Sequence, residues 1–154
     1  MVVNNSADIT TAERIESLKA GILGGLSFTL AYSIAVVGNN LVLAQQFEVL
    51  ADLQLPAPIN LLMRIGIAFF SGFLFGITYR YVIREDKNSH LNEGAVLAFG
   101  LVRGLASVEV KQNFIDTFWL LGVLSIESLF CFTIARFTLD FALHRHWIKF
   151  FKSN

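Results

Sequence analysis

The chain is poor in charge. Only 16% of its 154 residues are Asp, Glu, Lys or Arg, against about 25% in an ordinary soluble domain. Hydrophobic residues make up 55%, and the mean hydropathy is +0.60. Because a small soluble domain has much surface to cover with polar groups, this composition favours a protein embedded in lipid. Twelve basic residues balance twelve acidic ones, which excludes the strongly basic surface expected of a nucleic-acid-binding protein.

Cysteine and histidine are scarce as well. The single cysteine, Cys131, excludes an intramolecular disulfide. The histidines, His90, His144 and His146, all fall near the ends of the apolar stretches, so none is placed to hold a haem between helices. Their spacing from Cys131 does not suit a zinc site. No phosphate-binding loop, nucleophile elbow or pair of catalytic carboxylates is visible. We therefore predict no enzyme activity, no cofactor and no metal.

Long apolar runs are the dominant positive feature. A helix needs about 20 apolar residues to cross a bilayer, and four stretches come close to that length. They predict an all-α integral membrane four-helix bundle over residues 20–143, with spans at about 20–42, 59–83, 93–110 and 114–143. A polar segment, 1–19, precedes it, and the capping-box spacing at residues 10–13 predicts a short amphipathic lead-in helix there. A basic, aromatic tail, 144–154, follows and is typical of an interfacial anchor.

The basic residues in the connections and at the ends of the spans predict how the chain is threaded. They gather before the first span, between the second and third, and after the fourth: Arg14, Lys19, Arg80, Arg84, Lys87, Arg145, Lys149 and Lys152. Residues 44–58 contain no Lys or Arg, and the connection between the third and fourth spans contains only Lys111. By the positive-inside rule, both termini are expected on the cytoplasmic side.

The third span, 93–110, is the weakest of the four. Each of its large apolar residues favours insertion by about 0.3–0.6 kcal/mol, whereas Arg103 opposes it by roughly 2.5–3.5 kcal/mol. These contributions nearly cancel. The helix is therefore expected to insert only when it is packed on its neighbours; the alternative is an amphipathic helix on the membrane surface.

Small residues predict where the helices approach one another, because close backbone contact is the main source of helix association in lipid. The pairs Gly72-xxx-Gly76 and Gly100-xxx-Gly104 have the required spacing. On a helix, Gly100, Arg103 and Gly104 share one face, so Arg103 is expected to point toward the protein. A weak similarity of residues 18–21 to 91–94, and of 72–80 to 128–136, is compatible with two similar helical hairpins.

Two charges fall in the middle third of the bilayer, Arg103 in the third span and Glu127 in the fourth. An isolated charge there is costly, so we predict an interhelical Arg103–Glu127 pair. Such a pair either fixes helix register, handles protons or ions, or docks another subunit. Arg64 either pairs with Glu109 or extends to the headgroups.

Asn39 and Asn40, near the far end of the first span, either line a polar cavity or end that helix.

Residues 94–109, GAVLAFGLVRGLASVE, resemble a group of small membrane proteins of cyanobacteria with plastid relatives. That resemblance implies a multi-pass protein of the thylakoid or plasma membrane of a photosynthetic organism. It implies no site residues, since no established activity belongs to the group.

Taken together, these features predict a non-enzymatic accessory or assembly subunit of a larger membrane complex. Its expected partners are the lipid bilayer and other membrane subunits or further copies of itself. The alternative is a small oligomeric transporter or channel with Arg103 and Glu127 near its pathway. A lipid-modifying enzyme is a weaker third possibility, because no nucleophile or metal cluster faces either leaflet.

Overall fold

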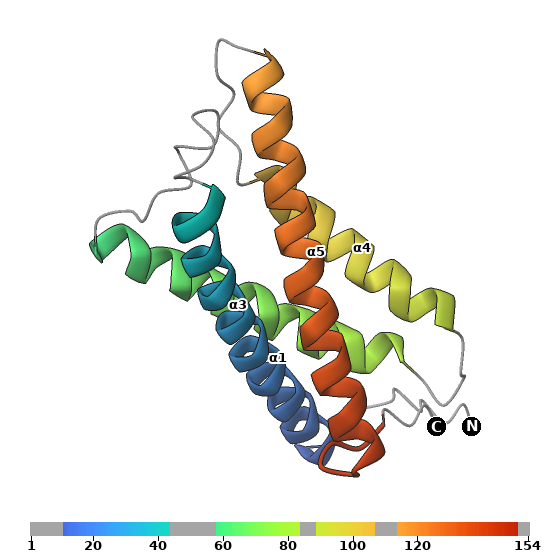
Figure 1. The fold of residues 1–154 in the computed structure, drawn as a ribbon. Helices are drawn as coiled ribbons and strands as arrows, with labels where there is room; N and C mark the ends of the chain where they lie inside the picture. The colour runs from blue at the N-terminus through green and yellow to red at the C-terminus, as the bar shows by residue number, and fades with distance from the viewer. Residues whose placement is uncertain (1–10, 44–57, 84–88, 107–113, 151–154) are drawn as a thin grey trace, which may run out of the picture.

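The computed structural model describes residues 11–43, 58–83, 89–106 and 114–150, and in this part of the chain the protein is all-α (Figure 1). The predicted four-helix architecture is confirmed. The helices are α1 (Thr11–Gly38), α3 (Pro58–Val82), α4 (Ser89–Ala106) and α5 (Phe114–His144). A π-helical segment, η1 (Asn39–Leu43), continues α1. The polar start of α1 and the first apolar stretch thus form one continuous helix from Thr11.

The helices alternate in direction and associate as two hairpins (Figure 1). α1 packs mainly on α3, α4 packs mainly on α5, and α1 and α5 join the two hairpins. We call the end where α1 begins and α3 and α5 finish the basal end, and the opposite one the distal end. Both ends of the described chain lie at the basal end, as expected for an even number of spans. That this end faces the cytoplasm stays a prediction.

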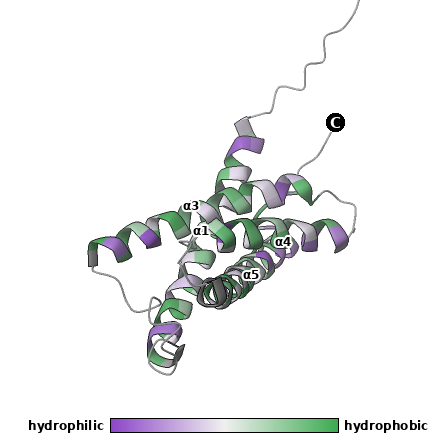
Figure 2. Cartoon of the chain, turned by 90° about the horizontal axis from the view of Figure 1, so that it is seen from above, coloured by the Kyte–Doolittle hydropathy of each residue, from purple (hydrophilic) through white to green (hydrophobic). Residues whose placement is uncertain are grey.

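Three stretches are long and apolar enough to cross a membrane: Thr11–Leu41, Ile59–Val82 and Thr117–His144. Many of their large apolar side chains point outward, and hydrophobic positions run along all four helices in Figure 2. This identifies a membrane protein. α4 is not among these three. Its 18 residues span about 27 Å, just short of the roughly 30 Å hydrocarbon core, and residues 107–113 that follow lie outside the described part.

The centre of the bundle is filled by phenylalanine, with one ring from each helix. The Phe28 and Phe132 ring centroids are 4.4 Å apart, and Phe75 lies 5.0 Å from Phe132. Phe99 completes the group at 5.4 Å from Phe75 and 5.7 Å from Phe132. Offset and edge-on ring contacts at these distances are favourable beyond simple apolar contact. This phenylalanine cluster fills the space at which all four helices meet.

The two hairpins are closed by glycine contacts. A Cβ added at Gly72 would come within 2.6 Å of the Gly24 carbonyl oxygen, and one at Gly76 within 2.3 Å of the Ala20 carbonyl oxygen. Both distances are far inside van der Waals contact, so only glycine allows α1 and α3 to lie this close. The same holds between α4 and α5, where Gly100 lies against Leu129 and Gly104 against Ser125.

Candidate functional site

Polar side chains gather on the distal side of the phenylalanine cluster, inside the apolar part of the bundle. We call Tyr32, Asn39, Ser71, Arg103 and Glu127 the distal polar cluster. They come from all four helices, counting η1 with α1. Polar groups at this depth are costly unless they are hydrogen-bonded or paired, so their contacts decide what the cluster can do.

Arg103 reaches out of its own hairpin. Its Nη1 donates a hydrogen bond to Ser71 Oγ on α3 at 2.9 Å. Its guanidinium carbon lies 5.0 Å from the Phe28 ring centroid and 5.2 Å from that of Tyr32, both on α1. Cation–π contacts in desolvated surroundings contribute about 2 kcal/mol or more. Arg103 therefore binds the α4–α5 hairpin to the α1–α3 hairpin, and its leucine neighbours Leu97 and Leu101 remain exposed on the opposite face.

Glu127 of α5 is held by a side chain of η1. The Asn39 Nδ2 group donates a hydrogen bond to its Oε2 atom. Its carboxylate also attracts the guanidinium groups of Arg103 and Arg64. α1 ends at Gly38, and from Asn39 the chain continues in the wider π-helical turn of η1, a rare conformation that is frequent at functional sites. The Asn39–Glu127 contact is the second polar link between the hairpins.

The structure brings both members of the predicted Arg103–Glu127 pair into the distal polar cluster. Arg103 and Glu127 attract each other electrostatically, and each also makes a hydrogen bond to a further helix, Arg103 to Ser71 and Glu127 to Asn39. The reason is that the Arg103 guanidinium turns toward the rings of α1. Depth in the membrane alone could not reveal this, since it says nothing about which neighbour a long side chain meets.

Arg64 lies near the same cluster. It is exposed on α3, and its charge acts on both Tyr32 and Glu127. Its predicted partner, Glu109, lies outside the described residues, so that pair stays a prediction. The electrostatic field at the Glu127 carboxylate therefore comes from two arginines on two different helices.

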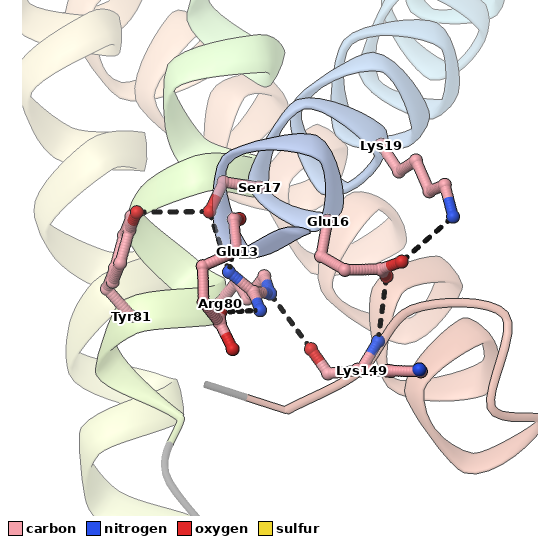
Figure 3. A network of polar contacts seen from close by, with 7 residues as sticks. All are labelled: Glu13, Glu16, Ser17, Lys19, Arg80, Tyr81 and Lys149. Carbon is pink, nitrogen blue, oxygen red and sulfur yellow. Dashed lines mark hydrogen bonds and ion pairs between the residues drawn. The ribbon is translucent and has the colours of Figure 1, made fainter. Parts of the chain in front are cut away.

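A second polar group closes the basal end, and Figure 3 shows it at close range. Arg80 of α3 is only 1% exposed. Its Nη1 donates to Ser17 Oγ at 2.7 Å and to the Glu13 carbonyl oxygen at 3.2 Å, and its Nε donates to the Lys149 carbonyl oxygen at 2.9 Å. Nη2 pairs with the Glu13 carboxylate. One guanidinium thus joins the start of α1, the end of α3 and the segment after α5.

Glu16 extends this basal network. Its carboxylate accepts a hydrogen bond from Lys19 Nζ at 2.8 Å and another from the Lys149 backbone N–H at 3.0 Å (Figure 3). Lys149 is thereby bound through both its N–H and its carbonyl group. From the sequence, Arg80 is expected with the basic residues between the second and third spans, whereas the structure buries it. The i, i+4 spacing of Glu13 and Ser17 was the one available signal, because it puts two acceptors on one face of α1.

The segment after α5 turns back onto the bundle. The Trp147 N–H donates to the Ala142 carbonyl at 2.9 Å, and the His146 N–H donates to the Leu143 carbonyl at 3.1 Å. His146 has a positive φ of 58°. This is a Schellman ending with histidine where glycine is usual, and the Trp147 ring packs edge-on to Phe141. Ile148 becomes buried, so the predicted interfacial tail is also part of the core.

The positive φ at His146 leads to a testable expectation. His146→Val should destabilise docking of this segment by about 1–2 kcal/mol, because a β-branched residue is strained in the left-handed region, whereas His146→Gly should leave it docked. Limited trypsin digestion after Lys149, followed by mass spectrometry, measures the difference. Equal cleavage rates for the two variants would show that the turn does not hold the segment.

Between the two polar regions, Tyr79 of α3 is completely buried and donates a hydrogen bond to Asp140 Oδ1 at 2.7 Å. Arg136 Nε lies 3.6 Å from the other carboxylate oxygen. This contact joins α3 to α5 on the basal side of the phenylalanine cluster. Within the described ranges, no group of three His, Cys, Asp or Glu side chains could hold a metal ion, and Cys131 is buried.

The chain matches no protein-family model, no curated protein and no solved structure. The resemblance over residues 94–109 therefore stays a prediction.

Proposed function

We propose that this protein is a non-enzymatic accessory or assembly subunit of a larger membrane complex. The observation that carries the proposal is the set of contacts made by the two intramembrane charges. Arg103 is engaged by Ser71 and two aromatic rings, and Glu127 by Asn39. Each contact links the two hairpins, which is what a structural role requires. The photosynthetic membrane suggested by residues 94–109 is proposed as its setting.

The filled centre supports the same proposal. The phenylalanine rings meet where a pathway through a single four-helix unit would have to run. Meanwhile the outward faces of α1 and α3 present rows of large apolar side chains, among them Leu26, Leu30, Ile67 and Phe70. Such faces suit contact with lipid and with the helices of other membrane subunits.

Purification from native membranes in mild detergent, followed by mass spectrometry of the co-purifying proteins, tests this proposal. The expected result is a complex of higher mass with a reproducible set of other membrane subunits. Recovery of the protein alone, at the mass of one chain, would refute it.

The alternative function is an oligomeric transporter or channel, and the distal polar cluster is the observation that favours it. Glu127 and Asn39 are only partly buried, and Arg64 is exposed next to them. In an oligomer, these groups would border a pathway between copies. Glu127 would then be the residue that exchanges a proton or binds a cation.

Glu127→Gln separates the two functions, because the amide retains an oxygen that can accept the Asn39 hydrogen bond but loses the charge. Under our proposal, co-purification of the partners is unchanged, and neither wild type nor variant conducts protons or potassium in proteoliposomes above the empty-vesicle rate. The double variant Arg103→Leu with Glu127→Leu should likewise retain partner association if the pair is purely architectural. Wild-type flux that Glu127→Gln abolishes would establish the transporter instead.

A further inference from the structure

An apolar groove runs along the outside of the bundle between α1 and α5. It has a volume of about 360 Å³ and is lined by Leu23, Leu26, Ser27, Leu30, Ala31 and Ile34 of α1, with Ile134 and Thr138 of α5. Its position next to the junction of the two hairpins places it at the lipid-facing surface of the membrane-spanning helices.

The dimensions of the groove fit a single hydrocarbon chain. From Leu23 to Ile34, α1 rises about 16 Å, close to half of the roughly 30 Å hydrocarbon core and therefore to the depth of one leaflet. A helix of about 10–12 Å diameter would need more room over that length than the groove of about 360 Å³ offers. A partner helix would rest on its rim, whereas an extended acyl chain would enter it.

The groove wall also offers no free polar group to a solute. The Ser27 hydroxyl donates to the Gly24 carbonyl at 3.2 Å, and the Thr138 hydroxyl donates to the Ile134 carbonyl at 2.9 Å. Both hydroxyls are thus satisfied within their own helices. What remains exposed along the groove is hydrocarbon, which selects an apolar occupant.

Cationic side chains stand at the basal mouth of the groove. Lys19 lies one helical turn before Leu23 on the same face of α1, and its side chain is 53% exposed. Arg145 follows the last residue of α5, two turns beyond Thr138; it is exposed and sits over the Phe141 ring. Because α1 and α5 run antiparallel, with Phe28 against Phe132, both cations lie on the basal side of the groove, with Arg145 about 6 Å further out than Lys19. Trp147, two residues after Arg145 in the chain, is exposed and is a residue typical of the headgroup level.

We propose that this groove binds one acyl chain of an anionic phospholipid from the leaflet at the basal end, with its phosphate held by Lys19 and Arg145. Lys19 also forms an ion pair with Glu16, and Arg145 supplies the second positive charge for the phosphate. Binding at this position would brace α1 against α5, the contact that joins the hairpins. The inference requires only the membrane location and holds under either function proposed above.

Retention of phosphatidylglycerol against phosphatidylcholine tests the site. The full-length protein is reconstituted in vesicles containing equal amounts of both, extracted in mild detergent and analysed by native mass spectrometry. The wild-type protein should retain one phosphatidylglycerol molecule in preference to phosphatidylcholine. Each cation near a membrane surface contributes about a fivefold preference for anionic lipid, so Lys19→Gln with Arg145→Gln should remove most of it. Both residues are exposed and leave the fold intact.

Two matched variants complete the experiment. Arg14→Gln removes an exposed charge from the opposite face of α1 and should leave the preference unchanged. Ser27→Phe fills the groove and should abolish the retained lipid, and Leu30→Trp does the same from an exposed position if Ser27→Phe does not fold. An unchanged preference in the Lys19–Arg145 variant, an equal loss in Arg14→Gln, or full retention by a folded groove-filling variant would each overturn the proposal.

Discussion

Replacing Arg80 by leucine is expected to lower the free energy of unfolding by about 3–5 kcal/mol, the usual cost of removing one partner from a buried ion pair. The substitution leaves the Glu13 carboxylate without its guanidinium and the Lys149 carbonyl without its donor. Leucine cannot reach either group. The large effect comes from these unsatisfied partners more than from the intrinsic strength of the pair.

Arg80→Lys is the informative companion. It keeps the positive charge but replaces a planar group that donates in three directions with a compact ammonium group. It should retain the contact to Glu13 and lose the hydrogen bond to the Lys149 carbonyl, giving an intermediate loss of stability. Lys19→Gln is the matched control, because its partly exposed ion pair with Glu16 is expected to contribute no more than about 1 kcal/mol.

Unfolding in detergent, followed by circular dichroism during titration with a denaturing surfactant, measures these stabilities. Protease sensitivity after Lys149 gives a second readout, because Arg80 holds that residue at the basal end. We expect Arg80→Leu to be both less stable and more rapidly cleaved. If Arg80→Leu and Lys19→Gln lose similar stability, Arg80 does not hold the basal end together.

The helices themselves were predictable because hydropathy and length are properties of contiguous residues. The predicted spans 59–83 and 114–143 lie within a residue of α3 and α5. The first and third helices depart further from the predicted spans. α1 begins at Thr11 and not near residue 20, and α4 covers Ser89–Ala106 where 93–110 is predicted. α4 is shorter than the other three and is joined to α1 and α3 through Arg103, whereas its dependence on these neighbours for insertion stays a prediction.

The partners of the charged residues could not be predicted in the same way. Both arginines have side chains long enough to reach several helices, so sequence position gives their depth but not their direction. Arg80 was counted with the connecting loops, yet it is buried. Arg103 and Glu127 attract each other as predicted, but the hydrogen bond of Arg103 to Ser71 is not apparent from the sequence. These outcomes depend on how the helices are rotated, which only the packed bundle determines.

Which phenylalanines form the core also depends on how the helices are rotated. The sequence has fifteen phenylalanines, and in an apolar helix each could equally face lipid or protein. Phe28, Phe75 and Phe132 are completely buried, whereas Phe70 and Phe130 on the same helices as two of them are exposed. Small residues carried more information, since a glycine on a helix face marks a place where backbones can approach.

Gly76→Ala is expected to separate α1 from α3. The new methyl group would lie 2.3 Å from the Ala20 carbonyl oxygen and 3.1 Å from the Gly21 Cα atom. These are backbone atoms, so the clash cannot be relieved by rotating a side chain. Overpacking of this kind typically costs about 1–3 kcal/mol, and here it acts at the contact that holds one hairpin together.

Gly66→Ala provides the matched control within the same helix, because nothing lies within 4 Å of its added methyl group. Alanine is the better helix former by about 1 kcal/mol, so Gly66→Ala should be neutral or stabilising. Because this gain applies to both positions, the two alanine variants should differ by the overpacking cost of about 1–3 kcal/mol in unfolding free energy, measured by the same surfactant titration. Equal stabilities would mean that α1 and α3 can move apart without loss.

We expect the glycine contact to affect the distal polar cluster as well, so the Gly76 variant also tests whether the two sites are energetically coupled. A methyl group at Gly76 would displace α1, which carries the Phe28 and Tyr32 rings that hold Arg103. Loss of that contact would leave an intramembrane cation with fewer partners, at a cost of its own. Gly76→Ala should then lose less stability when Arg103 is already leucine than in the wild-type background. Additive losses in the double variant would show that the glycine contact and the Arg103 site are energetically independent.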